Sequence, residues 1–268
     1  MTLVPRLPAH APETIRVFLR HQVELSESRG VVLGLSGGID SAVMARLAAD
    51  AIGAKKVLGV LLPGQDYPPE LLQETQGYAD SLGIRTRILP IAAIEDAVRA
   101  LLPEVRDRTT RGNVAARSRM ILLYSLAREG RALVVGTGNK SELLTGYFTK
   151  YGDGGADVLP MGDLYKTQLR ELAGQLEIPP AVQKRSPTAG LWAGQTDEGE
   201  LGLPYADLDR ILMGIEQLRS PEEIARITRI PIGKVRAVEA RVEASRHKRR
   251  TPPIPKLSLR TIGLDWRE

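Results

Sequence analysis

The chain has 268 residues, of which 43% are apolar and 26% are charged, a balance typical of soluble globular proteins. It has no cysteine, which excludes a disulfide scaffold, a thiolate metal site and a cysteine nucleophile. Its net charge of +5 suits phosphate ligands but is too small to require nucleic acid. No apolar run approaches the roughly 18 residues of a membrane span and no signal peptide is evident, so we expect a cytoplasmic protein without a membrane partner.

The first half of the chain alternates between strand-like and helix-like segments. Short apolar runs that end in Gly or Pro predict strands, and apolar residues at helical spacing predict helices between them. In chain order we predict strand 31–35, helix 41–51, strand 56–62, helix 69–82, strand 84–89, helix 113–129 and strand 131–136. This alternation is typical of a doubly wound α/β fold, in which helices cover both faces of a mostly parallel sheet. The carboxyl ends of such strands meet at one edge, where ligands bind.

The second half is dominated by one long loop and a helical region. The loop, residues 147–162, contains four glycines and no clear period, and loops of this length are usually functional or disordered. From Lys166 onward the pattern predicts a mainly helical C-terminal part. With no repeat or linker, we expect a single domain over residues 1–268.

Within the helical part, residues 220–227 and 232–236 indicate two helices joined by a short turn, and a basic run follows at residues 246–250. Such a pair could form a DNA-binding helix-turn-helix. Paired helices are far commoner as packing elements, and the net charge is low for a DNA-binding protein. We therefore expect no nucleic-acid partner.

A glycine-rich turn, Ser36-Gly37-Gly38-Ile39-Asp40-Ser41, follows the first predicted strand. Two glycines allow backbone N–H groups to converge on an anion, and the next helix adds unpaired amides and its positive end. Asp40 is out of place beside phosphates unless a cation accompanies them, which indicates Mg²⁺. An ordinary capped turn is the alternative, but the SGGxDS pattern after a strand favours phosphate binding. Residues 136–141, GTGNKS, are no Walker A loop, because Asn139 stands where a glycine belongs.

The SGGxDS turn resembles the ATP pyrophosphatase superfamily, whose members cleave ATP to AMP and pyrophosphate while they activate an oxygen atom. Further motifs closely resemble the NAD synthetase family in its short form, which lacks a glutaminase domain. They are GNVAARSRM (112–120), VVGTGNKSE (134–142), GYFTKYGD (146–153), DVLPMGDLYKT (157–167), PTAGLW (187–192) and GQTDE (194–198). The similarity runs over residues 36–248. It departs at Leu61, where many relatives carry Arg, so we assign no adenine contact there.

This resemblance implies an enzyme that amidates deamido-NAD with ammonia through an adenylated nicotinate carboxylate, releasing AMP and pyrophosphate. It also implies Mg²⁺ as cofactor and a homodimer with deamido-NAD bound near the interface. The implied ATP-binding residues are Gly34, Leu35, Ser36, Gly37, Gly38, Ile39, Asp40, Ser41, Thr137, Lys166 and Thr188. The implied deamido-NAD-binding residues are Arg117, Lys150, Asp157, His247 and Lys248, and the implied Mg²⁺ ligands are Asp40 and Glu142.

The composition itself indicates the nitrogen donor. Taking ammonia from glutamine in the usual way needs a cysteine that forms a thioester, and this chain has none. We therefore expect free ammonia as the substrate. Two alternative functions stay open: another ATP pyrophosphatase activity, such as tRNA modification, and an ATP-binding regulatory protein.

Overall fold

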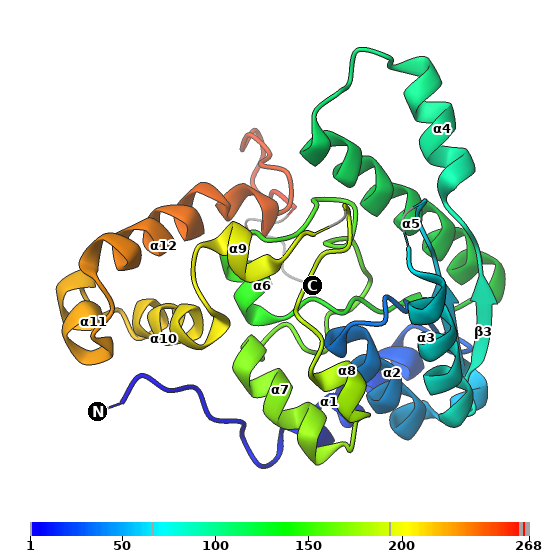
Figure 1. Cartoon of the computed structure of the whole chain (residues 1–268), viewed down its shortest axis with the longest axis horizontal. Coiled ribbons are helices and arrows are strands. Elements are labelled where there is room, and N and C mark those ends of the chain that lie inside the picture. Colours follow the sequence, from blue (N-terminus) through cyan, green and yellow to red (C-terminus); the bar gives the residue numbers. More distant parts are fainter. Residues whose placement is uncertain (1, 66, 193, 263–264, 266–268) are drawn as a thin grey trace.

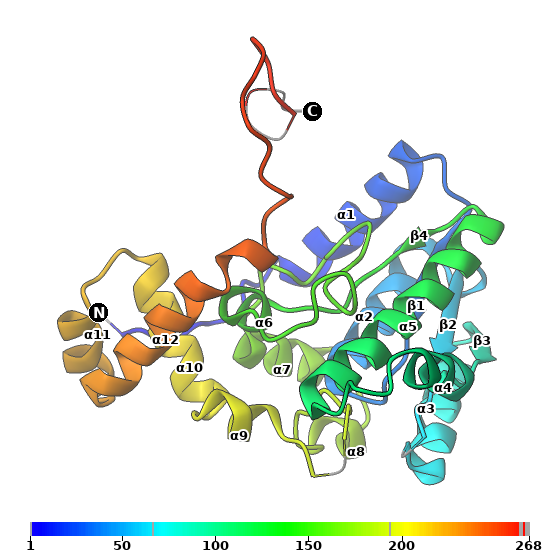
Figure 2. The ribbon, with the colours of Figure 1, turned by 90° about the horizontal axis from the view of Figure 1, so that it is seen from above.

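The computed structural model (Figure 1) describes residues 2–65, 67–192, 194–262 and 265. Its four-stranded sheet has the order β3-β2-β1-β4 (Figure 2). The strands are β1 (Val31–Gly34), β2 (Val57–Leu61), β3 (Arg85–Ile88) and β4 (Leu133–Val134). Every pairing is parallel, as the sequence predicts. The chain builds the sheet from β1 outward to β3 and then crosses to β4. The topological switch point, where α/β folds bind ligands, therefore lies between β1 and β4.

Helices cover both faces of the sheet, which confirms the doubly wound prediction. In β1, Val31 and Leu33 face one hydrophobic cluster and Val32 faces another, so the strand is buried on both sides. The first face carries α1 (Ala11–Leu25), α2 (Ile39–Ile52), α3 (Pro69–Ser81) and α7 (Lys166–Gln175). The second face carries α5 (Arg108–Gly130), against which α4 (Ala92–Leu101) packs.

Some element bounds differ from the predicted ones for identifiable local reasons. Helix α5 begins before the predicted residue 113, because the Asp107 side chain accepts a hydrogen bond from the Thr110 amide and caps the helix there. Strand β4 is shorter than the predicted 131–136. Arg131 has the left-handed φ of 50° at the end of α5, and Val135 forms only an isolated bridge with Val158. Helices α1, α4 and α6 (Lys140–Thr145) were not predicted.

The C-terminal part is mainly helical, as expected. It contains α8 (Pro180–Gln183), α9 (Asp197–Leu201), α10 (Tyr205–Glu216), α11 (Pro221–Thr228) and α12 (Ile232–Ala244). Figures 1 and 2 show α10, α11 and α12 at the end of the molecule away from the sheet. Tyr205, Ile224 and Val235 bury one shared core there, so the two predicted helices pack on α10. Beyond the 3₁₀ helix Arg246–Lys248, the described residues up to 262 extend away from the body (Figure 2).

The long loop, residues 147–162, contains no helix or strand, as predicted, but it is folded on itself. The Thr149 hydroxyl donates to Asn113 Oδ1 of α5 at 2.7 Å, and the Thr149 amide donates to Asp153 Oδ1 at 2.8 Å. The loop therefore lies against α5 at the carboxyl edge of the sheet. None of the described helices is long and apolar enough to cross a membrane.

Candidate active site

The glycine-rich turn leaves β1 at the switch point and starts α2. Gly37 has a φ of +75°, and a Cβ there would lie 2.6 Å from side-chain atoms of Leu71 and Thr75, so this position requires glycine. Gly38 is the N-cap of α2, and no described side chain caps this helix start. The amides of the first turn therefore remain available to an anion, which the positive end of the helix also attracts. These features fit the predicted phosphate site.

The remaining residues predicted for the turn shape its backbone. Gly34 ends β1, and the Leu35 amide donates to the Val60 carbonyl at 2.8 Å. The side chains of Leu35 and Ile39 are buried in the core, so only their backbone atoms can face a ligand. Ser36 Oγ and Ser41 Oγ share a hydrogen bond of 3.2 Å that closes the turn.

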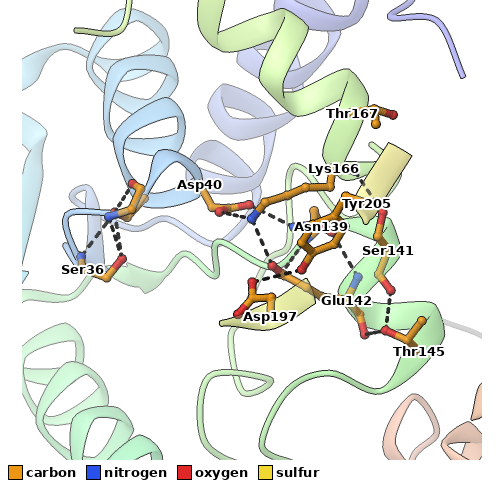
Figure 3. A network of polar contacts seen from close by, with 12 residues as sticks. Ser36, Asp40, Asn139, Ser141, Glu142, Thr145, Lys166, Thr167, Asp197 and Tyr205 are labelled. Carbon is orange, nitrogen blue, oxygen red and sulfur yellow. Dashed lines mark hydrogen bonds and ion pairs between the residues drawn. The ribbon is translucent and has the colours of Figure 1, made fainter. Parts of the chain in front are cut away.

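Lys166 is the first residue of α7, and its side chain points toward the turn (Figure 3). Although it is only 2% exposed, its ammonium group lies 2.5 Å from Asp40 Oδ2 and 3.4 Å from Glu142 Oε1. The structure thus brings three predicted site residues together from α2, α6 and α7. The two carboxylates raise the pKa of Lys166 despite its burial, so the side chain is charged at neutral pH.

Asn139 joins the two carboxylates, although the sequence analysis gave it no role. Its side-chain amide donates to Asp40 Oδ1 at 2.9 Å. Its Oδ1 accepts from the Glu142 amide at 3.1 Å, and Glu142 Oε2 accepts from the Asn139 amide at 3.2 Å. This is a capping box at the start of α6. The spacing of Asn139 and Glu142 is the sequence signal that could have identified it.

Asp197 adds a third carboxylate that the sequence analysis did not single out (Figure 3). It is 4% exposed, and its Oδ2 accepts from the Tyr205 hydroxyl at 3.1 Å. Among the described residues, Oδ1 has no hydrogen-bond partner. Burial raises the pKa of Asp197 and raises that of Glu142 to about 8, with Asp40 adding to both effects. Three carboxyl groups close to one ammonium group therefore resist full ionisation, and a further cation at this site would favour their charged forms.

Asp209 of α10 supports this cluster from behind and was also missed. It is fully buried, and it accepts hydrogen bonds from the Ser141 hydroxyl at 2.5 Å and the Thr167 amide at 2.8 Å. The Ser141 hydroxyl in turn accepts from the Lys166 amide at 2.9 Å. Asp209 therefore fixes the start of α6 against the start of α7, and with it the relative placement of Glu142 and Lys166.

The donor set fits Mg²⁺ bound together with phosphates. Asp40 and Glu142 supply hard oxygen atoms, which converge on the single Lys166 ammonium at the phosphate-binding turn. In the part of the chain that the structure describes, no group of three or more His, Asp or Glu is arranged to hold a metal by itself. Mg²⁺ characteristically takes one or two protein carboxylates and completes its shell with water and substrate phosphates.

Four of the five predicted deamido-NAD residues form a connected group. Arg117 Nε of α5 donates to the Lys150 carbonyl at 3.3 Å, and Lys150 Nζ donates to the His247 carbonyl at 3.0 Å. Lys248 Nζ donates to the carbonyls of Gly146 and Phe148, both at 2.7 Å. The long loop and the C-terminal 3₁₀ helix are thereby joined beside α5.

Asp157, the fifth predicted residue, belongs to the long loop and contacts Tyr124, which is nearer the C-terminal end of α5 than Arg117. Its carboxylate accepts from the Val134 amide at 2.7 Å and from the Tyr124 hydroxyl at 3.2 Å. Arg117 and Tyr124 share one face of α5, two turns apart, which is roughly 10 Å. The separation suits an extended ligand such as a dinucleotide better than a compact one.

Thr137 and Thr188 occupy different positions relative to the cluster. Thr137 follows β4 and lines a small recess with Glu142, Phe148 and Asp153. Thr188 is exposed in the segment between α8 and α9, and its hydroxyl accepts from the Gly190 amide at 3.1 Å. It lies outside the hydrogen-bonded group around Lys166. Leu61, the position of the departure from the family pattern, is buried in the core.

A family model described as NAD synthase matches residues 12–252, which include the turn, the carboxylate cluster and the basic group beside α5. The chain belongs to the NAD synthase family. Its curated relatives in this family span almost the same length. The NH(3)-dependent NAD(+) synthetase of Methanosarcina mazei is 45% identical over 251 residues, covering 92% of this chain and 98% of that protein. The NH(3)-dependent NAD(+) synthetase of Thermococcus kodakarensis is 45% identical over 246 residues, covering 91% of this chain and 96% of that protein.

Solved structures of NAD synthase relatives share the fold. The NMN synthetase of Francisella tularensis superposes with a TM-score of 0.83 at 31% identity, covering 94% of this chain and all of that one. The NH3-dependent NAD synthetase of Campylobacter jejuni superposes with a TM-score of 0.77 at 31% identity, covering 92% and 97%. The parallel sheet and flanking helices are therefore those of the family.

Proposed function

We propose that this protein is a ligase that amidates deamido-NAD with ammonia at the expense of ATP. The observation that carries the proposal is the convergence of Asp40, Glu142 and Lys166 at a phosphate-binding turn in a chain of the NAD synthase family. The curated relatives at about 45% identity are ammonia-dependent NAD synthetases. This membership disfavours tRNA modification and a purely regulatory ATP-binding role.

The first half-reaction joins two anions. A carboxylate oxygen of the nicotinate attacks the α-phosphorus of ATP, the bond to the β-phosphate oxygen breaks, and pyrophosphate leaves. Electrostatic repulsion opposes this approach, so positive charge is required. Lys166 supplies one positive charge, and the amides at the start of α2 bind phosphate oxygens. We propose that Asp40 and Glu142 hold Mg²⁺, which when bound neutralises charge on the transferring phosphoryl group.

The second half-reaction forms the amide. The ammonia nitrogen attacks the acyl carbon of the adenylate, AMP leaves with the bond electrons, and the nitrogen loses a proton. The protein provides no covalent nucleophile for either step, so positioning and charge carry the catalysis. We propose that the backbone of Gly34 to Ser41, with Thr137, Lys166 and Thr188, binds ATP. We propose further that Arg117, Lys150, Asp157, His247 and Lys248 bind deamido-NAD.

We also propose that the protein acts as a cytoplasmic homodimer whose chains are single domains. The face of α5 that carries Arg117 continues through Ile121 and Tyr124, which are 58% and 39% exposed. An exposed apolar face beside the proposed dinucleotide site supports a second copy there, because burying such residues stabilises an interface. Sedimentation of the active protein as a monomer at assay concentration would overturn this part of the proposal.

Pyrophosphate release, measured with different acceptors and nitrogen donors, tests the function. We expect release that depends on deamido-NAD, and NAD formation only when ammonium is supplied. Nicotinate mononucleotide is the necessary comparison, because one solved relative bears the name NMN synthetase. A higher kcat/KM for the mononucleotide would reject deamido-NAD as the substrate. NAD formation from glutamine alone, with contaminating ammonia and glutaminase excluded, would reject ammonia as the donor.

A further inference from the structure

The carbonyl groups of the glycine-rich turn present a problem for phosphate binding. A turn that binds phosphates must direct its N–H groups at the ligand and keep its carbonyl oxygens away from it, because those oxygens repel an anion. Gly37, with its unrestricted backbone, is the residue where the chain can most easily turn a carbonyl the wrong way. Something must therefore hold the turn in the binding orientation.

Three side chains bind the first three carbonyls of this turn, and two of them come from distant parts of the chain. The Tyr67 hydroxyl donates to the Ser36 carbonyl at 2.9 Å, and the Ser41 hydroxyl donates to the Gly38 carbonyl at 2.9 Å. Arg185 Nη1 donates to the Gly37 carbonyl between them. The carbonyl oxygens of Ser36, Gly37 and Gly38 are thus all engaged within the protein.

Arg185 is the charged member of this set and is itself held in place. Its Nη2 lies 2.6 Å from Glu74 Oε2 of α3, so the guanidinium bridges α3 and the turn. The same guanidinium lines a recess beneath the turn, together with Thr75 and Tyr78. Arg185 follows α8 and precedes Thr188 by three residues, so this contact also ties the segment carrying Thr188 to the phosphate site.

From these contacts we infer that Arg185 is a positioning residue for ATP, which holds the Gly37 carbonyl away from the phosphates, and that Glu74 orients it. The inference rests on the ATP-binding part of the proposed function and adds residues outside the predicted site. Arg185 acts through the backbone of the turn rather than by touching the nucleotide.

Binding of a non-hydrolysable ATP analogue with Mg²⁺, measured by calorimetry, tests the inference without turnover. Loss of one charge-assisted hydrogen bond is worth about 1.4 kcal/mol or more, so Arg185→Met should raise the Kd of the analogue about tenfold. Arg185→Lys, which keeps the charge but not the two-pronged contact, should recover only part of the affinity. The matched control is Arg236→Met, which breaks an exposed 2.8 Å ion pair with Glu222 between α11 and α12 and should leave the Kd unchanged.

Glu74→Gln separates positioning from simple charge attraction. If Glu74 orients Arg185, this variant should weaken the analogue severalfold. If Arg185 acts only as a positive charge, removal of the neighbouring negative charge should tighten binding, which would overturn the inference. An unchanged Kd in a folded Arg185→Met variant would also overturn it, and a thermal melt of each variant establishes that it is folded.

A kinetic readout completes the test. The Arg185 and Glu74 variants should raise the KM for ATP and leave the KM for deamido-NAD unchanged, whereas a general structural defect would raise both and would contradict the inference. Analogue binding does not depend on which acceptor is adenylated. The inference can therefore fail while the proposed reaction stands, and it can hold even if the acceptor proves to be a different carboxylate.

Discussion

Asp209→Asn should destabilise the protein and slow the reaction, although Asp209 touches no substrate in our proposal. The buried carboxylate accepts from the Ser141 hydroxyl at 2.5 Å and from the Thr167 amide at 2.8 Å. Asparagine retains one acceptor oxygen and presents an NH₂ group to the other donor. One charge-assisted hydrogen bond is lost, worth about 1.5–3 kcal/mol, and the remaining bond becomes neutral.

Removal of a buried charge partly offsets this loss of hydrogen bonding. Burial raises the pKa of Asp209, which means that the folded protein holds its charged form at a disadvantage that asparagine avoids. We therefore expect the free energy of unfolding to fall by about 2 kcal/mol rather than by the full value of both bonds. Because the start of α7 is then less well fixed, Lys166 should lose its placement and kcat should fall about tenfold.

Urea denaturation followed by circular dichroism measures the first effect, and the pyrophosphate assay measures the second. The matched control is Asp207→Asn on the same helix, whose partly exposed pair with Arg210 is 3.5 Å long. It should change the free energy of unfolding by no more than about 0.5 kcal/mol. If Asp209→Asn is as stable and as active as this control, Asp209 does not hold α7 in place.

Four further predictions concern the site. Asp40→Asn and Glu142→Gln should each reduce turnover at least about a hundredfold, because an amide is a weaker Mg²⁺ ligand than a carboxylate. Added Mg²⁺ should restore little of this turnover. Near wild-type turnover in either variant would refute the metal assignment. The pKa of Glu142, about 8 in the folded protein, lies above its ordinary 4.5, so the ligand-free protein should lose stability as the pH rises from 4.5 through 8. Urea titrations across this range should show a flatter profile for Glu142→Gln, with a smaller slope remaining from Asp197 and Asp209. Arg117→Ala should weaken deamido-NAD much more than ATP in calorimetry, whereas equal losses would mean that Arg117 is structural. Hydrogen exchange in residues 147–162 should slow when ATP and deamido-NAD bind together, and identical exchange with and without ligands would exclude a closing loop.

The sequence predicted the sheet well where each strand carries its own signal. Strands β1 and β2 are apolar runs bounded by glycine or proline, and both lie within one or two residues of their predicted ends. The length of strand β4 was overestimated, because the strand ends at Val134 and the next residue, Val135, forms an isolated bridge with Val158 of the long loop. Helix α4 was missed, and it buries no residue and contacts mainly α5, so its position depends on tertiary packing.

The candidate site was predicted in its charged residues but not in the contacts that hold them. Asp40 and Lys166 are 126 residues apart, and only the resemblance to a family indicated that they would meet. Asn139 donates a hydrogen bond to Asp40 directly, and Asp209 fixes the start of α7, which carries Lys166. By our inference, Arg185 holds the turn that precedes Asp40. Apart from the capping-box spacing of Asn139 and Glu142, no local pattern marks these residues, because their partners lie 42 to 148 positions away in the sequence.

The outer strand β3 has a consequence for assembly. An edge strand offers unpaired N–H and C=O groups to which another chain can add. Here that edge carries Arg85 and Arg87, both exposed, on a strand of four residues. A second copy added at this edge would bring like charges opposite one another, which disfavours a sheet shared between two molecules. Copies of this protein should therefore associate through their helices and keep their sheets separate, which also protects a concentrated solution from growth by strand addition.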